Sequence, residues 1–113
     1  MIHERRAYPR KKVSLSTNIL ENKTEKVLGD CILTDISKNG FAMESETSLN
    51  IGQQFDLELE ILNRKILLNG KIIRASDGLF YPLYGVKIID NESKNLDFFR
   101  QYIDLRMYYY ENN

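Results

Sequence analysis

Residues 55–61 alternate strictly between apolar and acidic side chains, from Phe55 through Asp56 to Ile61. This period of two is typical of a β-strand with one face in the core and the other in water. A helix cannot produce it, because the apolar positions of a helix recur every three to four residues. The middle of the chain is therefore predicted to be β-structure, with the carboxylates of this segment on a solvated face.

Further strand-like segments surround this one at short intervals, at residues 13–20, 27–36, 41–44, 65–75 and 84–89. They are separated by turn-forming stretches, among them Ser37-Lys38-Asn39-Gly40, Asn63-Arg64 and Ser76-Asp77-Gly78. Gly29 is a candidate β-bulge. Pro82 places residues 79–83 in an edge or a loop, because proline cannot donate a ladder hydrogen bond.

After residue 90 the apolar period changes to that of a helix. Leu96, Phe99 and Ile103 recur at spacings of three and four residues, which predicts an amphipathic helix of about four turns. The expected fold class is therefore mainly β: an antiparallel barrel of six to seven strands over residues 13–90, followed by a C-terminal helix over residues 91–113.

Charge is balanced over the 113 residues, with 16 basic and 16 acidic side chains, but it is not balanced at the N-terminus. Residues 1–12 contain five basic residues and one acidic residue, a net charge of +4, which leaves −4 on the rest. A nucleic-acid-binding domain normally carries a basic excess over its whole length, so nucleic acid is not an expected partner. We expect a flexible basic arm, suited either to one compact anion or simply to solubility.

Several function classes are excluded by what the sequence lacks. His3 and Cys31 are the only histidine and the only cysteine, whereas a structural zinc site takes about four such ligands. His3 also lies near a chain end, where the backbone is usually too loose for a catalytic relay. No apolar run approaches the length needed to insert into a membrane, and a lone cysteine fits a reducing compartment. We expect a cytoplasmic domain that holds no metal and is not an enzyme.

Two short motifs carry most of the functional information. Arg6 and Arg10 form R-x-x-x-R in the basic arm, and Asp35, Ser37 and Gly40 form D-x-S-x-x-G at the end of the second predicted strand. By composition the first motif is expected roughly 0.4 times by chance in a chain like this, and the second only roughly 0.02 times. The second motif is therefore the informative one.

The residue types of these motifs suit a guanine nucleotide. A guanidinium group binds phosphate with two hydrogen bonds and stacks on flat rings. A carboxylate accepts from paired donors such as the N1–H and N2–H₂ groups of guanine. A serine hydroxyl and the free N–H groups of a turn suit phosphate oxygens, and glycine allows a ligand to approach the backbone. This combination favours binding over catalysis.

With these motifs the whole chain resembles the PilZ domain family, small bacterial β-barrels that bind the second messenger cyclic di-GMP. The arginine pair precedes the first strand, the D-x-S-x-x-G motif follows at the usual distance, and Tyr84-Gly85-Val86-Lys87-Ile88 is similar to a late strand of the family. The resemblance implies that residues 1–113 are a single, stand-alone PilZ domain and a cyclic di-GMP receptor.

The resemblance also implies roles for individual residues. Arg6 and Arg10 would clasp phosphates and stack on guanine, Asp35 would pair with a guanine edge, and Ser37 and Gly40 would line the phosphate side.

Two further arginines are candidates beside the motifs. In this family an arginine at the position of Arg5 tends to accompany a stacked cyclic di-GMP dimer, so one or two ligand molecules are both expected possibilities. Arg74, in the penultimate predicted strand, is a further candidate, for which an ordinary surface charge is the favoured interpretation.

The expected mechanism is a ligand-ordered arm: cyclic di-GMP would fold residues 1–12 over the barrel and change the surface offered to a downstream protein that the sequence does not identify. The alternative is a ligand-independent interaction or scaffold module of the same fold. A small nucleic-acid-binding barrel is a weaker alternative, because the basic cluster is confined to the arm. An enzyme acting on the nucleotide is the weakest, because no metal ligands or general base accompany the motifs.

Overall fold

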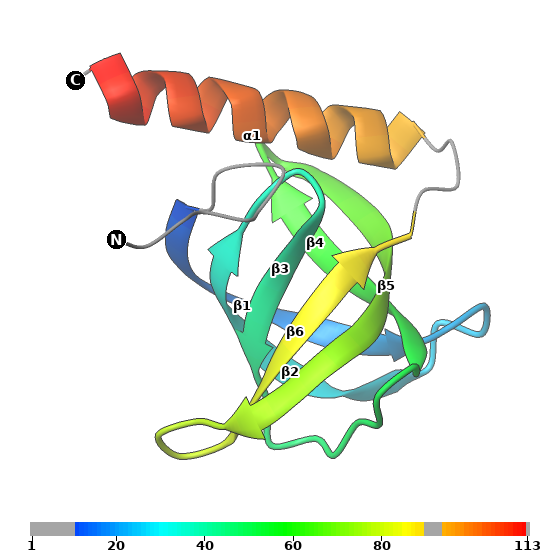
Figure 1. The fold of residues 1–113 in the computed structure, drawn as a ribbon. Helices are drawn as coiled ribbons and strands as arrows, with labels where there is room; N and C mark the ends of the chain where they lie inside the picture. Colours follow the sequence, from blue (N-terminus) through cyan, green and yellow to red (C-terminus); the bar gives the residue numbers. More distant parts are fainter. Residues whose placement is uncertain (1–10, 90–93, 113) are drawn as a thin grey trace.

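The computed structural model describes residues 11–89 and 94–112. They form β1 (Lys11–Glu21), β2 (Val27–Ile36), β3 (Gly40–Glu44), β4 (Gln54–Ile61), β5 (Arg64–Asp77), β6 (Pro82–Ile88) and α1 (Lys94–Asn112). Neighbouring strands are antiparallel and close into a barrel in the order β1-β2-β3-β6-β5-β4. The helix lies across one end of this barrel (Figure 1). The expected fold class is confirmed, with six strands in the described part of the chain.

The barrel closes because its long strands each pair with two neighbours. β5 pairs with β4 through its first half and with β6 through its second half. β1 pairs with β2 along most of its length and with β4 through only four residues, from Asn18 opposite Glu58 to Glu21 opposite Phe55. Closure pairs the backbone N–H and C=O groups that a sheet edge would otherwise leave without partners.

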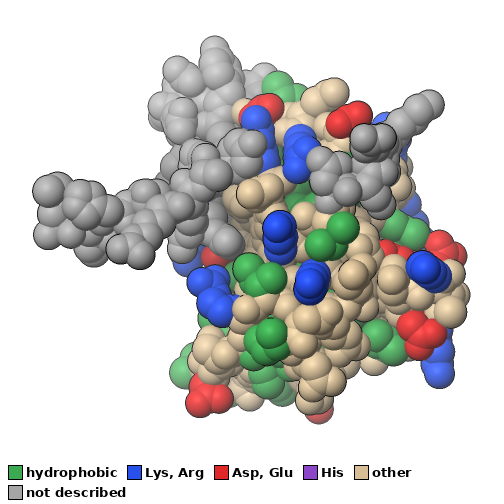
Figure 2. All heavy atoms as spheres, turned by 45° about the vertical axis from the view of Figure 1, so that its right-hand side comes forward, with side chains coloured by type: hydrophobic (Ala, Val, Ile, Leu, Met, Phe, Trp, Pro, Cys, Tyr) green, Lys and Arg blue, Asp and Glu red, His purple; other side chains and the backbone are tan. Residues whose placement is uncertain are grey.

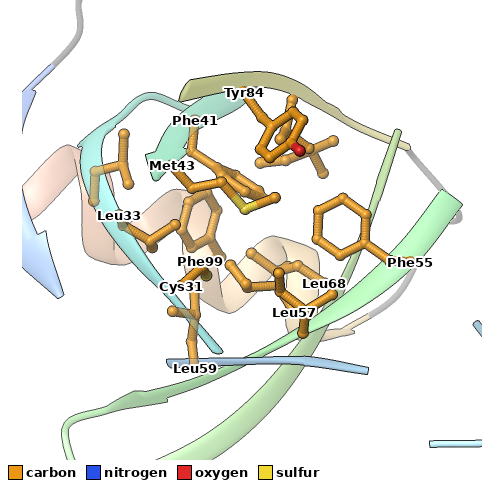
Figure 3. Packing of buried hydrophobic residues seen from close by; sticks show 14 of the residues in the cluster. Cys31, Leu33, Phe41, Met43, Phe55, Leu57, Leu59, Leu68, Tyr84 and Phe99 are labelled. Carbon is orange, nitrogen blue, oxygen red and sulfur yellow. The ribbon is translucent and has the colours of Figure 1, made fainter. Parts of the chain in front are cut away.

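The core lies inside the barrel, where the alternation in β4 is confirmed. Phe55, Leu57, Leu59 and Ile61 are buried, whereas the acidic residues between them face outward. The rings of Phe41 and Phe55 meet edge to face, with centroids 6.4 Å apart. Figure 3 shows Phe99 of α1 packed among the strand side chains of this cluster, so the helix contributes directly to the core.

The apolar face of the helix is the predicted one, because Leu96, Phe99 and Ile103 are all buried. The helix lies within the predicted range of residues 91–113, and its 19 residues make about five turns rather than four. Within the described part of the chain, no helix is both long enough and apolar enough to cross a membrane.

The first strand differs from the prediction in two ways. It begins at Lys11, so Lys11 and Lys12 belong to the sheet, opposite Ile36 and Asp35, rather than to the arm. Leu15 occupies the same alternating position as buried Ile19, yet it is 41% exposed. Leu15 is opposite buried Leu33 in an unbroken register, so its exposure does not come from a reversed alternation. β4 pairs with β1 only from Asn18 to Glu21, so the cover that β4 gives to Ile19 does not extend to Leu15.

Smaller corrections concern the strand ends. The pairing of β1 with β2 shifts beside Gly29, as expected for a bulge there. β5 continues through Ser76 and Asp77, so the connection to β6 is residues 78–81. Pro82 is the first residue of β6, a position where proline is tolerated in a sheet.

The turn between β4 and β5 is Leu62–Asn63, one residue earlier than predicted. Both residues have positive φ, 51° and 63°, and they join Ile61 directly to its partner Arg64. This is the geometry of a two-residue type I′ hairpin, which favours Asn-Gly. Leucine was not predicted there because a non-glycine residue in this region of φ is unfavourable.

We expect the double substitution Leu62→Asn and Asn63→Gly to raise the free energy of unfolding by about 1 kcal/mol, because it relieves left-handed backbone strain at two exposed positions. Urea denaturation measures the change. Leu62→Ala is the matched control: it removes the exposed side chain but keeps the Cβ atom, so it should leave the midpoint almost unchanged. A midpoint raised equally by the control would contradict the strain argument.

Candidate functional site

The turn between β2 and β3 contains the D-x-S-x-x-G motif and is closed by Ser37. The Ser37 N–H donates to the Gly40 carbonyl oxygen at 2.9 Å, and the Ser37 hydroxyl donates to the same oxygen at 3.2 Å. The Asn39 N–H in turn donates to the Ser37 hydroxyl at 3.3 Å. Ser37 is 3% exposed. The observed contacts of Ser37 therefore hold the shape of the turn.

Gly40 and Asn39 join this turn to β6. The Ile88 N–H donates to the Asn39 carbonyl oxygen at 2.9 Å. A Cβ atom on Gly40 would collide with the Val86 carbonyl oxygen, so glycine is required by the close approach of two strands. Neither Gly40 nor Asn39 has the positive φ expected of an Asn-Gly turn.

Asp35 lies at the end of β2, half-buried, with Lys12 of β1 on one side and Ala42 of β3 on the other. The structure therefore brings Asp35, Ser37 and Gly40 together where β1 begins. Arg5, Arg6 and Arg10 lie outside the described residues, and their roles remain predictions.

The same turn also contacts the C-terminal helix, through Lys38. The Lys38 ammonium lies 2.7 Å from the Asp104 carboxylate, and the Arg100 Nε–H donates to the Lys38 carbonyl oxygen at 3.3 Å. Both the side chain and the backbone of Lys38 thus hold α1 against the turn. This contact was not predicted, because residues 38 and 100 are distant in sequence.

Outward-facing residues of four adjacent strands form a row that begins at Asp35. Asp35 is opposite Ala42 of β3, Ala42 is opposite Gly85 of β6, and Gly85 is opposite Arg74 of β5. β3, β6 and β5 lie side by side on the front of the barrel in Figure 1, and the end of β2 pairs with β3. We call the residues Ala42, Gly85 and Arg74 the shelf.

The shelf borders a hollow of about 320 Å³, lined also by Ser76, Leu83 and Tyr84. Arg74 is exposed and lies against Gly85: a Cβ atom on Gly85 would come within 2.9 Å of Arg74 Nε. For Arg74 an ordinary surface charge was the favoured interpretation, and Ala42 and Gly85 were not predicted to belong to a site. The sequence pattern that could have indicated them is a small residue between two large buried ones. Ala42 lies between Phe41 and Met43, and Gly85 lies between Tyr84 and Val86.

The surface around β5 and β6 is favourable for an anion. Lys71 and Lys87 are direct cross-strand partners, and both are exposed. In Figure 2 basic side chains lie along the middle of the face in view, and acidic ones lie toward its margins. Like charges placed opposite each other destabilise a sheet slightly, and they raise the local potential for a negatively charged ligand.

Cys31 belongs to the core rather than to a reactive site. Burial, with a smaller contribution from the Asp30 carboxylate, raises the pKa of the Cys31 thiol to about 12. The thiol is therefore protonated near neutral pH, whereas the thiolate is the nucleophile. Among residues 11–89 and 94–112, no three His, Cys, Asp or Glu side chains are grouped to hold a metal ion.

The sequence matches one known protein family, and the fold is similar to solved structures. The model of the PilZ domain family matches residues 4–105. A search of curated proteins found no match. Among solved structures, the PilZ domain of Escherichia coli YcgR with c-di-GMP is similar, with a TM-score of 0.68 and 18% identity, covering 97% of this chain and 99% of that chain.

Two longer structures are also similar. Escherichia coli YcgR in complex with c-di-GMP has a TM-score of 0.71 and 17% identity, covering 96% of this chain and 46% of that chain. The Bacillus subtilis inhibitor of motility, MotI/DgrA, has a TM-score of 0.70 and 18% identity, covering 93% of this chain and 52% of that chain. This chain therefore spans about half the length of either, and at these identities the likeness shows the fold.

Proposed function

The chain belongs to the PilZ domain family, and on that basis we propose that it is a receptor for cyclic di-GMP that binds through the R-x-x-x-R and D-x-S-x-x-G motifs. Two of the similar structures are complexes with c-di-GMP. We propose a binding protein rather than an enzyme, acting in the cytoplasm, where a free thiol such as Cys31 stays reduced.

The observation that carries this proposal is the meeting of β1 and the motif turn. Because β1 begins at Lys11, opposite Ile36, the chain enters the barrel beside Asp35. Arg10 directly precedes Lys11, and consecutive Cα atoms are about 3.8 Å apart. Arg6 is four residues earlier, a span of at most about 14 Å. Covalent connectivity alone therefore keeps both arginines within reach of the turn.

The proposed role of each residue follows from the chemistry of its side chain. Asp35 accepts from the N1–H and N2–H₂ groups of one guanine. Arg6 and Arg10 neutralise the two phosphates and stack on a base, and Arg5 adds a third guanidinium for a second ligand molecule. Ser37 and Gly40 hold the turn whose backbone faces the phosphates.

We propose that ligand binding changes the conformation of the domain and that a downstream protein recognises this change. Lys38 is part of the motif turn and also binds α1 through Asp104 and Arg100. A ligand that orders the turn would therefore bias the position of the helix, and the helix would bias ligand affinity by the same factor.

Titration of the purified chain with cyclic di-GMP in a calorimeter tests the proposal. We expect saturable binding of one or two molecules per chain, and at a hundredfold excess over Kd a stabilisation of about 2.7 kcal/mol, seen as a rise in melting temperature. Cyclic di-AMP is the control ligand, because adenine lacks the two donors that Asp35 would accept from; it should bind far more weakly.

The competing function is a ligand-independent scaffold of the same fold. A flat titration, together with an unchanged melting temperature and unchanged amide spectrum on addition of cyclic di-GMP, would favour the scaffold over the receptor.

A further inference from the structure

We propose that the tip of the β5–β6 hairpin, together with an acidic hollow beside it that is lined by Asp30, Glu44 and Glu46, binds another protein. The segment bound there presents arginine or lysine next to apolar side chains. The tip, residues 78–81, lies at the end of the barrel away from α1 (Figure 1). This inference deepens the proposed function, and it rests on that function for the identity of the occupant as the downstream protein.

The tip carries three consecutive large apolar side chains, where a hairpin usually has small or polar turn-forming residues. Leu79 is 83% exposed, Phe80 is 80% exposed and Tyr81 is 46% exposed. Ile32 of β2 is also exposed, and it lines the same hollow as Tyr81. Single exposed apolar residues are ordinary on a protein surface, whereas a cluster of them marks an interaction site. These four side chains lie outside the core cluster, so the fold alone does not account for them.

Backbone contacts fix the shape of the tip. Its ends join Asp77 of β5 to its partner Pro82 of β6. A Cβ atom on Gly78 would collide with the Tyr81 carbonyl oxygen, so the turn is closed by a close backbone approach. The Ser45 N–H donates to the Pro82 carbonyl oxygen at 3.2 Å, which ties the base of the hairpin to the end of β3. An apolar group on an ordered backbone loses less conformational entropy on binding, so this tip favours affinity.

The hollow beside the tip, of about 250 Å³, has an acidic lining. Neither residues 39–63 nor residues 75–86 contain a lysine or an arginine. Within the described part of the chain, the three carboxylates that line the hollow form no ion pair. A cation is therefore the complementary group, and a hollow smaller than most small-molecule pockets suits a single side chain. An arginine or lysine entering it meets both the carboxylates and the ring of Tyr81.

The charge of this surface favours a protein over a membrane. An exposed apolar hairpin tip is also suited to insertion into a lipid bilayer, but the membrane surfaces that attract peripheral proteins are anionic. They would repel the carboxylates of Asp30, Glu46 and Asp77, all of which are exposed. A protein segment that combines arginine or lysine with apolar side chains complements both the tip and the hollow, and arginine and aromatic residues supply much of the binding energy of interfaces.

This surface is separate from the motif turn. β3 begins at Gly40 in that turn and ends at Glu44 in the acidic hollow. Four residues of extended strand span about 13 Å. Cyclic di-GMP and a partner segment can therefore be bound at the same time, and each can be abolished without the other.

Fluorescence anisotropy with a synthetic peptide tests the surface. The probe is a fluorescein-labelled peptide in which arginine and leucine alternate, and we expect it to bind the full chain saturably. The double substitution Leu79→Ser and Phe80→Ser should weaken this binding at least about tenfold, and so should Glu46→Lys, as expected for residues at the centre of a contact. All three residues are exposed, so the variants should keep the melting temperature of the wild-type chain.

Leu62→Ser and Glu60→Lys are the matched controls, because they make the same changes at exposed positions of the β4–β5 hairpin. Each should change the affinity for the peptide less than about twofold, as expected for a distant residue or a screened charge. A peptide with glutamate in place of arginine should not bind, and a peptide with serine in place of leucine should bind more weakly.

A flat titration of the wild-type chain with the arginine–leucine peptide would overturn the docking surface, and so would equal affinities in the tip variants and the controls. Binding to phosphatidylglycerol vesicles that is lost with Leu79 and Phe80, without binding to the peptide, would replace it with a membrane contact. Calorimetry with cyclic di-GMP separates the two proposals, because the tip variants should bind this ligand as the wild-type chain does. A wild-type chain that binds the peptide but not cyclic di-GMP would refute the receptor function and leave the docking surface standing.

Discussion

Asp35→Ala is expected to weaken cyclic di-GMP binding by at least about 100-fold, because two charge-assisted hydrogen bonds, each contributing roughly 1.5–3 kcal/mol, are lost together. The half-buried position of Asp35 beside Lys12 and Ala42 strengthens this effect, since a guanine bound there would be partly removed from water. Calorimetry on the folded variant, with its melting temperature recorded alongside, measures the loss.

Two substitutions separate the hydrogen bonds of Asp35 from its charge. Asp30→Ala removes an exposed carboxylate from the other end of the same strand and should leave affinity nearly unchanged. Asp35→Asn keeps the size of the side chain but has a single acceptor oxygen, so it should retain only part of the affinity. Near-wild-type binding in Asp35→Ala would remove this residue from the proposed site.

The arm arginines extend the same prediction. Arg6→Ala and Arg10→Ala should each lose most of the binding, because each removes a guanidinium from a ligand that carries two phosphates. Near-wild-type affinity in both of these variants and in Asp35→Ala would contradict the two-motif site as a whole.

Phe99→Ala is expected to have the largest effect on stability, a loss of roughly 3–5 kcal/mol from the free energy of unfolding. Phe99 is 1% exposed and reaches from α1 into the cluster of strand side chains shown in Figure 3. Its removal leaves a cavity at the point where the helix joins the barrel, and the surrounding strands are held in place by closure and cannot collapse around it. Urea denaturation measures the change.

The neighbouring phenylalanine is a matched control. Phe98 is half-buried on the rim of the core, and the Arg64 guanidinium lies 4.4 Å from its ring centroid. Phe98→Ala should cost only about 1 kcal/mol, the loss of a partly exposed contact. Equal losses in the two variants would mean that the helix does not depend on Phe99 as its anchor.

The parts of the fold that were predicted correctly depend on local patterns. Alternation in residues 55–61 and the helical spacing of Leu96, Phe99 and Ile103 report directly which side chains are buried. The misplaced features, the exposure of Leu15 and the turn at Leu62–Asn63, arise where the geometry of paired strands overrides residue preference.

For the candidate site, the motif residues were identifiable because their types are unusual in that spacing. The local role of Gly40 was not, because it depends on β6: the Val86 carbonyl oxygen occupies the space of a side chain. The contact of Lys38 with α1 and the shelf were equally hidden, since each joins segments that are remote in the chain.

The order of polar and apolar residues along the chain was sufficient to predict a β-barrel with a terminal helix, because burial and turn formation act between near neighbours. The two motifs proposed to bind a ligand were also identified from the sequence alone. Strand register alone decided which outward-facing residues lie side by side on neighbouring strands. Register depends on how the barrel closes and where its bulges fall, and those are properties of the whole sheet, so Ala42, Gly85 and Arg74 become one surface only in the folded chain.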